Sequence, residues 1–508
     1  MDILLNRIQG NAKKMTLKEI LKNIVPESEL KNINPKILEV TSDSRKVKPG
    51  FLFVAYKGVD VDGHSFINKA IINGAVAVVG EEKLALSVPY FRVKNGRLAW
   101  AMMMANYYGN PEKQLTIIGV TGTDGKTTTT NLLYNFLKAA GTKVSMVSTI
   151  KAIIGGREFD TGLHTSSPDP DILWSWLSEA VKQGDTHIIL ETTSHGLAQY
   201  RFGDITFDIG VLTNLAHDHL EFHQTIKGYR SAKALLFEKS KLSILNQTSK
   251  EYKFFKSKAA GKVEPYNVKS EIKNIKYEAK DSSVTQTFDL LANGTWHTLT
   301  THLPGEYNLE NILAAAKTAL SLGVDITTIS KVLKNFKNLP GRFQTVPNRR
   351  NLHAIVDFAH TEQGIRSVLT LVRRNLIKDN ARLIAVFGCN GGRDQTKRAP
   401  MGKAACELAD LVVVTTEDPR NESIDQIYTQ IAQGCLEAGG VLNKTFFRVD
   451  DRKEAIGFAI NKLAKSGDWI LFLGKGHEQS MNLNGIETPW DETQTIKEII
   501  RKTNGRKG

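Results

Sequence analysis

The stretch from Gly119 to Thr127 has the composition of a phosphate-binding loop. Its sequence, GVTGTDGKT, places a lysine and a hydroxyl directly after closely spaced glycines. Glycines let backbone N–H groups approach phosphate oxygens, and a helix beginning at Lys126 would add the positive end of its dipole. Lys126 would then reach the β- and γ-phosphates, and the Thr127 hydroxyl would bind Mg²⁺. Because Val120 stands where the strict P-loop pattern has glycine, this is a variant loop, and a simple strand-to-helix turn is the alternative.

Acidic and histidine side chains follow two later apolar runs. Glu191 comes directly after HIIL, and a carboxylate at that end of a parallel strand lies where α/β sheets bind ligands. The segment from Thr213 to His223, TNLAHDHLEFH, ends in three histidines and two acids within seven residues. Such a cluster is compatible with zinc, but Mg²⁺ beside ATP prefers oxygen ligands. A solvated loop is an equal alternative.

These residues require a parallel α/β architecture to bring them together. A buried strand over Leu115 to Val120, the glycine loop and the apolar-periodic helix NLLYNFLKAA follow in the order of a nucleotide-binding unit. The stretch from Lys241 to about Thr300 is lysine-rich and polar, and weak alternation around Thr285 to Thr300 predicts a peripheral antiparallel hairpin there. Residues 338–341 (NLPG) predict a hinge. The other predicted strands are Val144 to Val147, His187 to Leu190, Ile209 to Leu212, Ala354 to Phe358, Leu383 to Phe387, Leu411 to Thr415 and Trp469 to Leu473.

The 508 residues suggest about three domains. The net charge is +14, but the lysines are scattered and have no aromatic ladder among them, which disfavours nucleic-acid binding. Cys389, Cys406 and Cys435 form no CxxC pair, and this fits a reducing cytosol. The longest apolar run, Leu98 to Ala105, is far shorter than the roughly 20 residues that span a bilayer. We expect a soluble, cytoplasmic protein without a membrane partner.

Together with later motifs, the TGTDGKTTT loop resembles that of the Mur ligases, the ATP-dependent amide-bond-forming ligases of peptidoglycan synthesis. Folylpolyglutamate synthetases share a similar loop, but from about Thr41 to Asp491 the chain resembles the Mur ligases that add the third peptide residue (MurE type). The resemblance implies an α/β fold in three domains. These are a UDP-substrate-binding domain over 1–112, an ATP-binding domain over 113–338 around a central P-loop-type parallel sheet, and an amino-acid-binding, Rossmann-like domain over 339–508.

The resemblance also implies a catalytic centre. The family's catalytic positions are matched by Lys126, Glu191, His219 and Lys233. Its ligands for two Mg²⁺ ions are matched by Thr127, Glu191, His219 and Lys233. Lys233, in YRSAK, matches a lysine that the family carbamylates. The carbamate could bind a metal ion, whereas the ammonium could not.

Further positions resemble the family's ATP contacts. Asn311 lies in LPGEYNLEN, Arg342 in PGRFQ and His360 in DFAHT. The implied contacts within the glycine loop are Gly122, Thr123, Asp124, Gly125, Lys126, Thr127 and Thr128.

Two regions resemble the part of the family that holds the UDP-linked substrate. Ser44 and Arg45 in SDSR, and His64 in DGH, match its uridine-diphosphate end, with ordinary turn formation as an equal alternative. The segment HTSSPD resembles a Thr-Thr-Pro loop in which serines replace the threonines. The other implied contacts are Ser166, Ser167, Ser194, Gln199 and Arg201.

Three loops of the last domain, GCNGGRD, EDPR and GKGHE, resemble the site of the incoming amino acid. Relatives selecting meso-diaminopimelate typically carry DNPR where this chain has EDPR. Arg420 keeps a fork that can grip a distal carboxylate, whereas Asp418 would repel that group and favour an ammonium. The arginine favours meso-diaminopimelate, while L-lysine or a less usual diamino acid stays open. The implied contacts are Arg393, Asp418, Pro419, Arg420, Gly474 and Glu478.

We therefore expect an enzyme of peptidoglycan precursor synthesis that uses ATP and two Mg²⁺ ions and acts as a monomer. It would phosphorylate the terminal carboxylate of UDP-N-acetylmuramoyl-L-alanyl-D-glutamate, and the amine of the diamino acid would displace the phosphate. The alternatives are an L-lysine-adding ligase, a folylpolyglutamate synthetase-like ligase, a catalytically inactive nucleotide-binding homologue and a basic nucleic-acid-binding ATPase.

Overall fold

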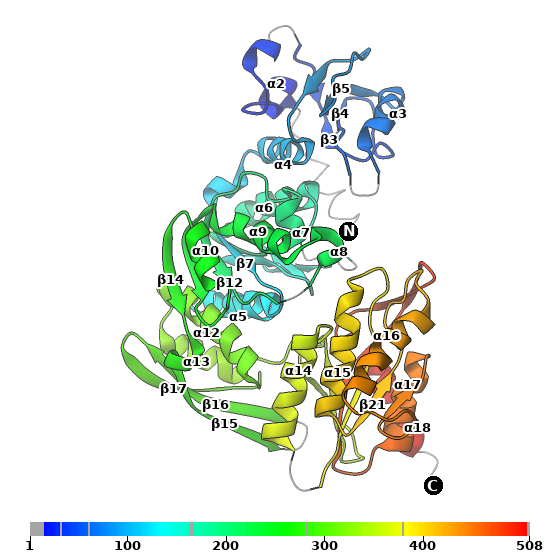
Figure 1. The fold of residues 1–508 in the computed structure, drawn as a ribbon. Helices are drawn as coiled ribbons and strands as arrows, with labels where there is room; N and C mark the ends of the chain where they lie inside the picture. The colour runs from blue at the N-terminus through cyan, green and yellow to red at the C-terminus, as the bar shows by residue number, and fades with distance from the viewer. Residues whose placement is uncertain are drawn as a thin grey trace.

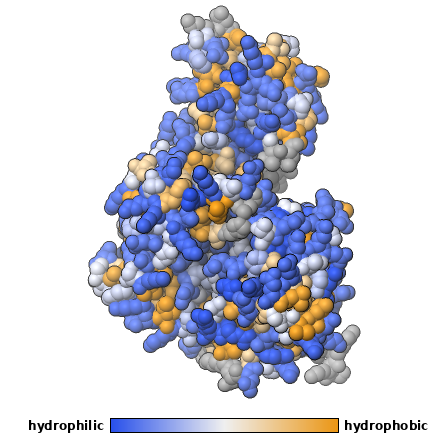
Figure 2. All heavy atoms as spheres, viewed as in Figure 1, coloured by the Kyte–Doolittle hydropathy of each residue, from blue (hydrophilic) through white to orange (hydrophobic). Residues whose placement is uncertain are grey.

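Three of the sheets have four or more strands, and each of these is the centre of one part of the molecule (Figure 1). The computed structural model describes residues 15–30, 33–58, 61–162, 167–216, 218–280, 283–377 and 380–504. None of the helices in these ranges combines the length and the apolar character that a membrane crossing requires. The surface seen in Figure 2 is mostly hydrophilic, with apolar side chains in small separate groups.

The first part contains a four-stranded parallel sheet in the order β3–β4–β5–β6. The apolar run from Leu98 to Ala105 lies in helix α4, whose buried side chains pack in the same core as those of the sheet. The strands of the sheet are β3 (Glu39–Thr41), β4 (Phe51–Val54), β5 (Ala75–Gly80) and β6 (Tyr90–Arg92), and a separate antiparallel pair is β1 (Met15–Thr16) and β2 (Lys36–Ile37). The helices are α2 (Leu17–Ile20), α3 (Ile67–Ile72) and α4 (Gly96–Tyr107).

The central part contains an eight-stranded sheet in the order β10–β9–β8–β11–β7–β12–β13–β14. Its six strands from β8 to β14 are parallel, and β9 and β10 extend it antiparallel. On β7, Ile117 and Ile118 belong to different core clusters because successive side chains face opposite sides of the sheet. This explains why the strand is a continuous apolar run. The strands are β7 (Thr116–Thr121), β8 (Val144–Val147), β9 (Ala152–Ile154), β10 (Arg157–Phe159), β11 (His187–Glu191), β12 (Phe207–Leu212), β13 (Ser240–Asn246) and β14 (Lys262–Tyr266).

Helices cover both faces of this sheet (Figure 1). Helices α5 and α12 pack against each other within the core cluster that includes Ile118. The helices of the central part are α5 (Lys126–Ala139), α6 (Pro170–Lys182), α7 (Ser194–Ala198), α8 (Leu220–His223), α9 (Ile226–Phe237), α10 (Tyr252–Lys258), α11 (Val268–Glu271), α12 (Glu306–Ser321) and α13 (Ile326–Asn335).

The antiparallel hairpin predicted around 285–300 is confirmed, whereas the preceding stretch from residue 241 adds to the central sheet. Strands β13 and β14 add to the parallel sheet and are not antiparallel. Their lysines, Lys241 and Lys262, are exposed at this edge of the sheet, where charged side chains are common on strands. The antiparallel structure begins later, with the three-stranded sheet of β15 (Ile272–Lys280), β16 (Ser283–Ala292) and β17 (Thr295–Thr301). Its far end reaches the last part of the molecule, because Val284 packs in that part's core (Figure 1).

The last part contains a six-stranded sheet in the order β18–β19–β23–β20–β21–β22, with β18 antiparallel at one edge. Its predicted strands agree with the structure to within a residue at either end. The strands are β18 (Gln344–Val346), β19 (His353–Asp357), β20 (Leu383–Phe387), β21 (Leu411–Val414), β22 (Phe446–Arg448) and β23 (Trp469–Leu473), and the hairpin β24 (Ser480–Leu483) and β25 (Ile486–Pro489) follows. The helices are α14 (Glu362–Leu371), α15 (Arg398–Leu408), α16 (Ile424–Glu437), α17 (Arg452–Phe458) and α18 (Glu492–Asn504).

The connection between the central and last parts passes through the predicted hinge. Gly341 has φ +64°, and a Cβ there would lie 2.2 Å from the backbone of Gly476, so the close approach requires glycine. Phe343 has φ +44° and is buried, and its N–H donates to Asp357 at 2.7 Å. The connection therefore has a defined conformation that is held by the end of β19.

Candidate active site

A cleft of about 770 Å³ lies between the central and last parts of the molecule. It is lined by loops that follow the carboxyl ends of parallel strands in both sheets, including β7, β8, β11, β19, β20, β21 and β23. This is the edge at which parallel α/β sheets bind ligands. Most of the predicted catalytic, nucleotide and amino-acid positions lie in these loops.

The glycine loop joins β7 to α5 and forms one wall of the cleft. Gly122 and Gly125 have φ +156° and +80°, and a Cβ on Gly125 would lie 2.0 Å from Asn311 Oδ1. Asn214 Oδ1 accepts from the N–H groups of Thr123 at 3.2 Å and Asp124 at 2.9 Å.

Helix α5 begins at Lys126, so its first N–H groups have no partner within the helix and lie beside the cleft. The Lys126 ammonium donates to the carbonyls of Gly122 at 3.1 Å and Thr123 at 2.7 Å. It thus lies over the loop in which a phosphate would be bound. Thr128 is buried within the helix and does not line the cleft.

Glu191 and Thr127 face each other at the floor of the cleft. The Thr127 hydroxyl lies 3.1 and 3.2 Å from the two oxygens of the Glu191 carboxylate. From the end of β8, Thr149 donates to the same carboxylate through its N–H at 3.0 Å and its hydroxyl at 2.8 Å. The buried carboxylate and the hydroxyl are oxygen donors of the kind that Mg²⁺ prefers.

Lys233 reaches the glycine loop from helix α9. Its ammonium nitrogen lies 2.6 Å from the Gly122 carbonyl and 4.5 Å from the centre of the Tyr229 ring. Burial, and then the nearby Lys126 charge, lower the pKa of Lys233 well below its ordinary value. The lowered pKa favours the neutral amine, which is the form that reacts with CO₂ to give a carbamate.

His219 has φ +56° and lies in the cleft between two acids. Its Nε2 is 3.3 Å from Asp218, and its Nδ1 is 3.5 Å from Glu221. The ring centres of His195 and His219 are 4.8 Å apart, and burial followed by the His219 charge lowers the pKa of His195 to about 3. In the described ranges, the histidines and acids of 218–223 do not form a group of three converging metal ligands.

Asp218 contacts several cations from the last part of the molecule. Lys397 and His360 lie 3.9 and 4.0 Å from its carboxylate. Burial alone would raise the pKa of Asp218, but His219, Lys397 and His360 hold it well below its ordinary range. Beside it, Arg393 donates to Glu221 at 3.1 Å. Ionic contacts thus join the two walls of the cleft.

The remaining predicted nucleotide positions surround the hinge. The Arg342 guanidinium stacks on the Phe358 ring at 4.7 Å, and its Nε is buried without a partner. His360 Nδ1 is 2.8 Å from the Phe358 carbonyl. Asn311 does not line the cleft, but its side chain lies directly behind Gly125 and donates to Asn308 at 3.3 Å.

The predicted amino-acid positions divide into two groups. Arg393, Arg420 and Glu478 line the cleft, and Arg420 has φ +54°. Pro419 and Gly474 lie behind the lining and shape the loops. A Cβ on Gly474 would lie 2.1 Å from the carboxylate of Glu417. Glu417 is the first residue of the EDPR motif and was not among the predicted contacts. Burial raises the pKa of Glu417 to about 7.

The geometry does not support the predicted contact of Asp418 with the substrate. Its carboxylate turns into the last part of the molecule, where it accepts from Lys475 at 2.9 and 3.1 Å and from the N–H of Asn482 at 3.0 Å. Both charged side chains are buried. Since the neighbouring ammonium neutralises it, Asp418 does not present a free negative charge to the cleft.

Only some of the residues predicted to bind the UDP-linked substrate lie in the cleft. Ser167, Ser194, Gln199 and Arg201 line the cleft, and Arg201 donates to the carbonyl of Ser167. Ser166 lies outside the described residues.

Ser44, Arg45 and His64 lie in the first part of the molecule and do not line the cleft. Ser44 is buried, whereas Arg45 is exposed and pairs with Asp43 at 2.9 Å.

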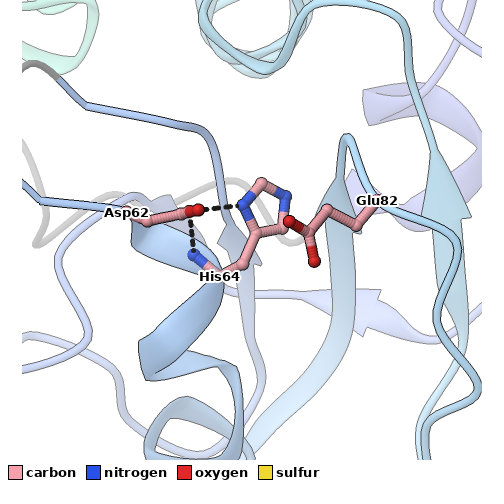
Figure 3. Close-up of side chains that lie close together, drawn as sticks. All are labelled: Asp62, His64 and Glu82. Atoms are coloured by element: carbon pink, nitrogen blue, oxygen red, sulfur yellow. Dashed lines mark hydrogen bonds and ion pairs between the residues drawn. The ribbon is translucent and has the colours of Figure 1, made fainter.

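Both ring nitrogens of His64 have partners within the protein, so a ligand contact through them would have to displace one of these partners. Nε2 accepts from the Glu81 N–H at 2.9 Å, so Nδ1 carries the proton and donates to Asp62 at 2.6 Å (Figure 3). Glu82 lies beside the ring without bonding to it (Figure 3). Although Asp62, His64 and Glu82 have three potential ligand atoms within 4.8 Å, the imidazole has no lone pair left for a metal ion.

Sequence reasoning missed four residues that shape the cleft. Thr149 holds the Glu191 carboxylate, and Asn214 holds the glycine loop. Lys397 faces Asp218, and Glu417 faces Gly474. Their position after predicted strands was the available signal, since loops at that edge converge on a common site.

Comparison with known proteins matches the three parts of the chain in order. Residues 36–108 match the Mur ligase family catalytic domain, residues 120–319 the Mur ligase middle domain, and residues 341–476 the Mur ligase glutamate ligase domain. A UDP-N-acetylmuramoyl-L-alanyl-D-glutamate–2,6-diaminopimelate ligase of Geobacillus thermodenitrificans is 36% identical over 92% of this chain and 96% of its own. The ligase of the same name from Caldanaerobacter subterraneus is 35% identical over 96% of this chain and 100% of its own.

The solved structures include a similar molecule over nearly the full length. The structure of a UDP-N-acetylmuramoyl-L-alanyl-D-glutamate–2,6-diaminopimelate ligase superimposes with a TM-score of 0.66 at 28% identity, covering 97% of this chain and 100% of the other. The predicted three-domain α/β fold is therefore confirmed, including the parallel central sheet and the last α/β domain.

Proposed function

This chain belongs to the Mur ligase family, and from that premise we propose that it joins meso-diaminopimelate to UDP-N-acetylmuramoyl-L-alanyl-D-glutamate at the expense of ATP. One observation carries the proposal. A single cleft is lined by Lys126 of the phosphate loop on one wall and by Arg393 and Arg420 on the other. A triphosphate and an amino acid with a distal carboxylate can therefore meet in one enclosed space.

The reaction proceeds in two displacements. An oxygen of the terminal D-glutamate carboxylate attacks the γ-phosphorus of ATP, and ADP leaves. The amine of the diamino acid then attacks the carbonyl carbon of the acyl phosphate, and phosphate leaves as the amide forms. The first step is needed because a free carboxylate is inert to amines. Positioning and electrostatic stabilisation account for the catalysis, since the reaction needs no enzyme nucleophile.

The residues on the central wall fit this chemistry. Lys126, with the N-terminus of α5, binds the β- and γ-phosphates. Thr127 and Glu191 would hold one Mg²⁺, and a carbamate on Lys233 with His219 would hold a second. When bound, the ions neutralise the repulsion between the substrate carboxylate and the triphosphate.

The other substrates occupy the two ends of the cleft. Ser167, Ser194, Gln199 and Arg201 bind the muramoyl-peptide end. Arg393 and Arg420 grip the distal carboxylate of meso-diaminopimelate, and the acids Glu417 and Glu478 receive its distal ammonium. L-Lysine has that ammonium but no distal carboxylate, which is why the two arginines favour meso-diaminopimelate. The protein acts as a monomer in the cytoplasm, where ATP is available.

Phosphate release tests the proposal directly. Purified protein with ATP and Mg²⁺ should release phosphate only when both the UDP-linked dipeptide and meso-diaminopimelate are present. Replacing meso-diaminopimelate by L-lysine should lower kcat/KM at least about tenfold, because the distal carboxylate contributes a charge-assisted hydrogen bond. Phosphate release that does not depend on the UDP-linked dipeptide, or a preference for L-lysine, contradicts the assignment.

A further inference from the structure

Two residues outside the cleft hold together the loops that carry Arg393 and Arg420. We propose that Glu422 and Arg398 are positioning residues that set the spacing between these two guanidinium groups, and thereby the fit of the cleft to the distal carboxylate of the amino acid. The inference rests on the proposed function, because it is there that the two arginines bind the amino acid. Neither Glu422 nor Arg398 lines the cleft, so they act through the loops and do not touch the substrate.

Glu422 is the point at which the two loops are joined. Arg398 forms a bidentate pair with its carboxylate, with distances of 2.6 and 2.8 Å. The same carboxylate accepts from the N–H of Gly392 at 2.9 Å and from Gln395 Nε2 at 3.1 Å. Gly392 is the residue directly before Arg393, and Glu422 lies two positions after Arg420. One carboxylate therefore fixes the backbone beside both substrate-facing arginines.

Arg398 ties this junction to the rest of the domain. Its side chain is 0% exposed, and that of Glu422 is 14% exposed. The Arg398 guanidinium also donates to the carbonyl of Asn390 at 3.1 Å and to Gln430 on α16 at 2.7 Å. Because these donors are arranged in a rigid plane, small changes at Arg398 are transmitted to both loops.

The backbones of the two loops are in direct contact. The N–H of Gly391 donates to the carbonyl of Asp418 at 2.7 Å, and a Cβ on Gly391 would lie 1.9 Å from the carbonyl oxygen of Pro419. No larger residue fits there unless the loops separate. Arg420, with φ +54°, is further held by backbone bonds to Asn482 and Asn484. The loops thus have one packed arrangement.

Arg393 and Arg420 bring two like charges to one cleft, and Glu221 pairs with the first of them. Burial, and then the Arg393 charge, lower the pKa of Arg420. Two guanidinium groups repel each other unless an anion lies between them or another group holds them in place. The Glu422 junction opposes that repulsion from behind, so the pair stays ready for a carboxylate.

Steady-state kinetics on the full chain test the inference. Glu422→Gln replaces a charged acceptor of Arg398 by a neutral amide, and it should raise the KM for meso-diaminopimelate about tenfold or more while leaving the KM for ATP within about twofold. Arg398→Lys keeps the charge but loses the bidentate fork, and it should also raise the KM for meso-diaminopimelate. A double variant should add little to either change, because the two residues act as a unit.

The matched control is a second ion pair of the last domain, which lies at the ends of β20 and β23 that are away from the cleft. Arg382 and Asp468 pair at 2.6 Å before β20 and β23 and do not line the cleft. Asp468→Asn should lower the thermal midpoint without changing the KM for meso-diaminopimelate. If Glu422→Gln leaves that KM unchanged in an active protein, or raises the KM values for ATP and the amino acid equally, the inference is overturned. A wild-type protein that releases no substrate-dependent phosphate overturns the proposed function instead.

Discussion

The carboxylate of Asp418 accepts a hydrogen bond from the ammonium of Lys475 at 2.9 Å, and both side chains are shielded from solvent. Glu478 shares the same ammonium at 2.7 Å. A buried ammonium flanked by two carboxylates has its charge compensated locally. Arg420 and Glu417 line the cleft and Asp418 does not, so we expect the distal group of the amino acid to meet the first two residues.

We expect Asp418→Ala to lower the free energy of unfolding by about 3 kcal/mol, because one member of a buried pair is lost. Asp418→Asn should cost less, since its amide oxygen can still accept from Lys475. Neither substitution should change the preference for meso-diaminopimelate over L-lysine in active protein. Urea unfolding and competition between the two amino acids provide the measurements. A switch in preference by Asp418→Asn at unchanged stability would show that this side chain confronts the substrate.

The stability of the protein should carry a pH signature from Glu417. Burial raises its pKa from 4.5 to about 7, so the folded state favours the protonated acid. Its contribution is complete below about pH 4.5 and is lost as the pH rises through about 7. Relative to Glu417→Gln, the wild-type protein should lose about 3 kcal/mol of stability over that interval. Urea unfolding of both proteins at several pH values measures this difference, and parallel curves would contradict it.

The positions of Glu191 and Thr127 could be predicted, whereas those of Asp418 and His64 could not. Both members of the first pair follow apolar runs whose ends must meet at one edge of a parallel sheet, so local pattern determines their place. Asp418 turns inward because of Lys475, 57 positions away, and the His64 ring is occupied by the N–H of Glu81, 17 positions away. Such distant partners leave no mark on the local pattern.

The same limit explains why the two parallel strands between residues 240 and 266 were not predicted. The strands β13 and β14 are short and lie within a polar, lysine-rich stretch of the chain, which gives little sign of a buried sheet when it is read alone. Their parallel pairing depends on β12, which is already in place within the sheet. The pairing direction of an edge strand is thus decided by its neighbour and not by its own composition.

Lys233 should carry a carbamate when CO₂ is present. Its pKa is lowered by burial and then by Lys126, and this favours the neutral amine that can add to CO₂. Depleting dissolved CO₂ should lower activity several-fold, and bicarbonate should restore it. Carbon-13 NMR in labelled bicarbonate should show a carbamate signal that is lost in Lys233→Met but kept in Lys239→Met, a change of the partly exposed lysine beside Asp204. A signal that persists in Lys233→Met would place the carbamate elsewhere.

Thr149 should control how tightly Mg²⁺ is bound, because it orients Glu191. Its N–H and hydroxyl hold both oxygens of that carboxylate, at 3.0 and 2.8 Å, opposite the Thr127 hydroxyl. Thr149→Val removes the hydroxyl at nearly constant volume and should raise the Mg²⁺ concentration for half-maximal activity about tenfold, as loss of an outer-shell hydrogen bond does elsewhere. Thr149→Ser, which keeps the hydroxyl, should behave nearly as the wild type. Titration of Mg²⁺ by calorimetry in the presence of a non-hydrolysable ATP analogue provides a readout independent of turnover. Equal Mg²⁺ affinity in the valine and serine variants would show that Glu191 keeps its orientation without this side chain.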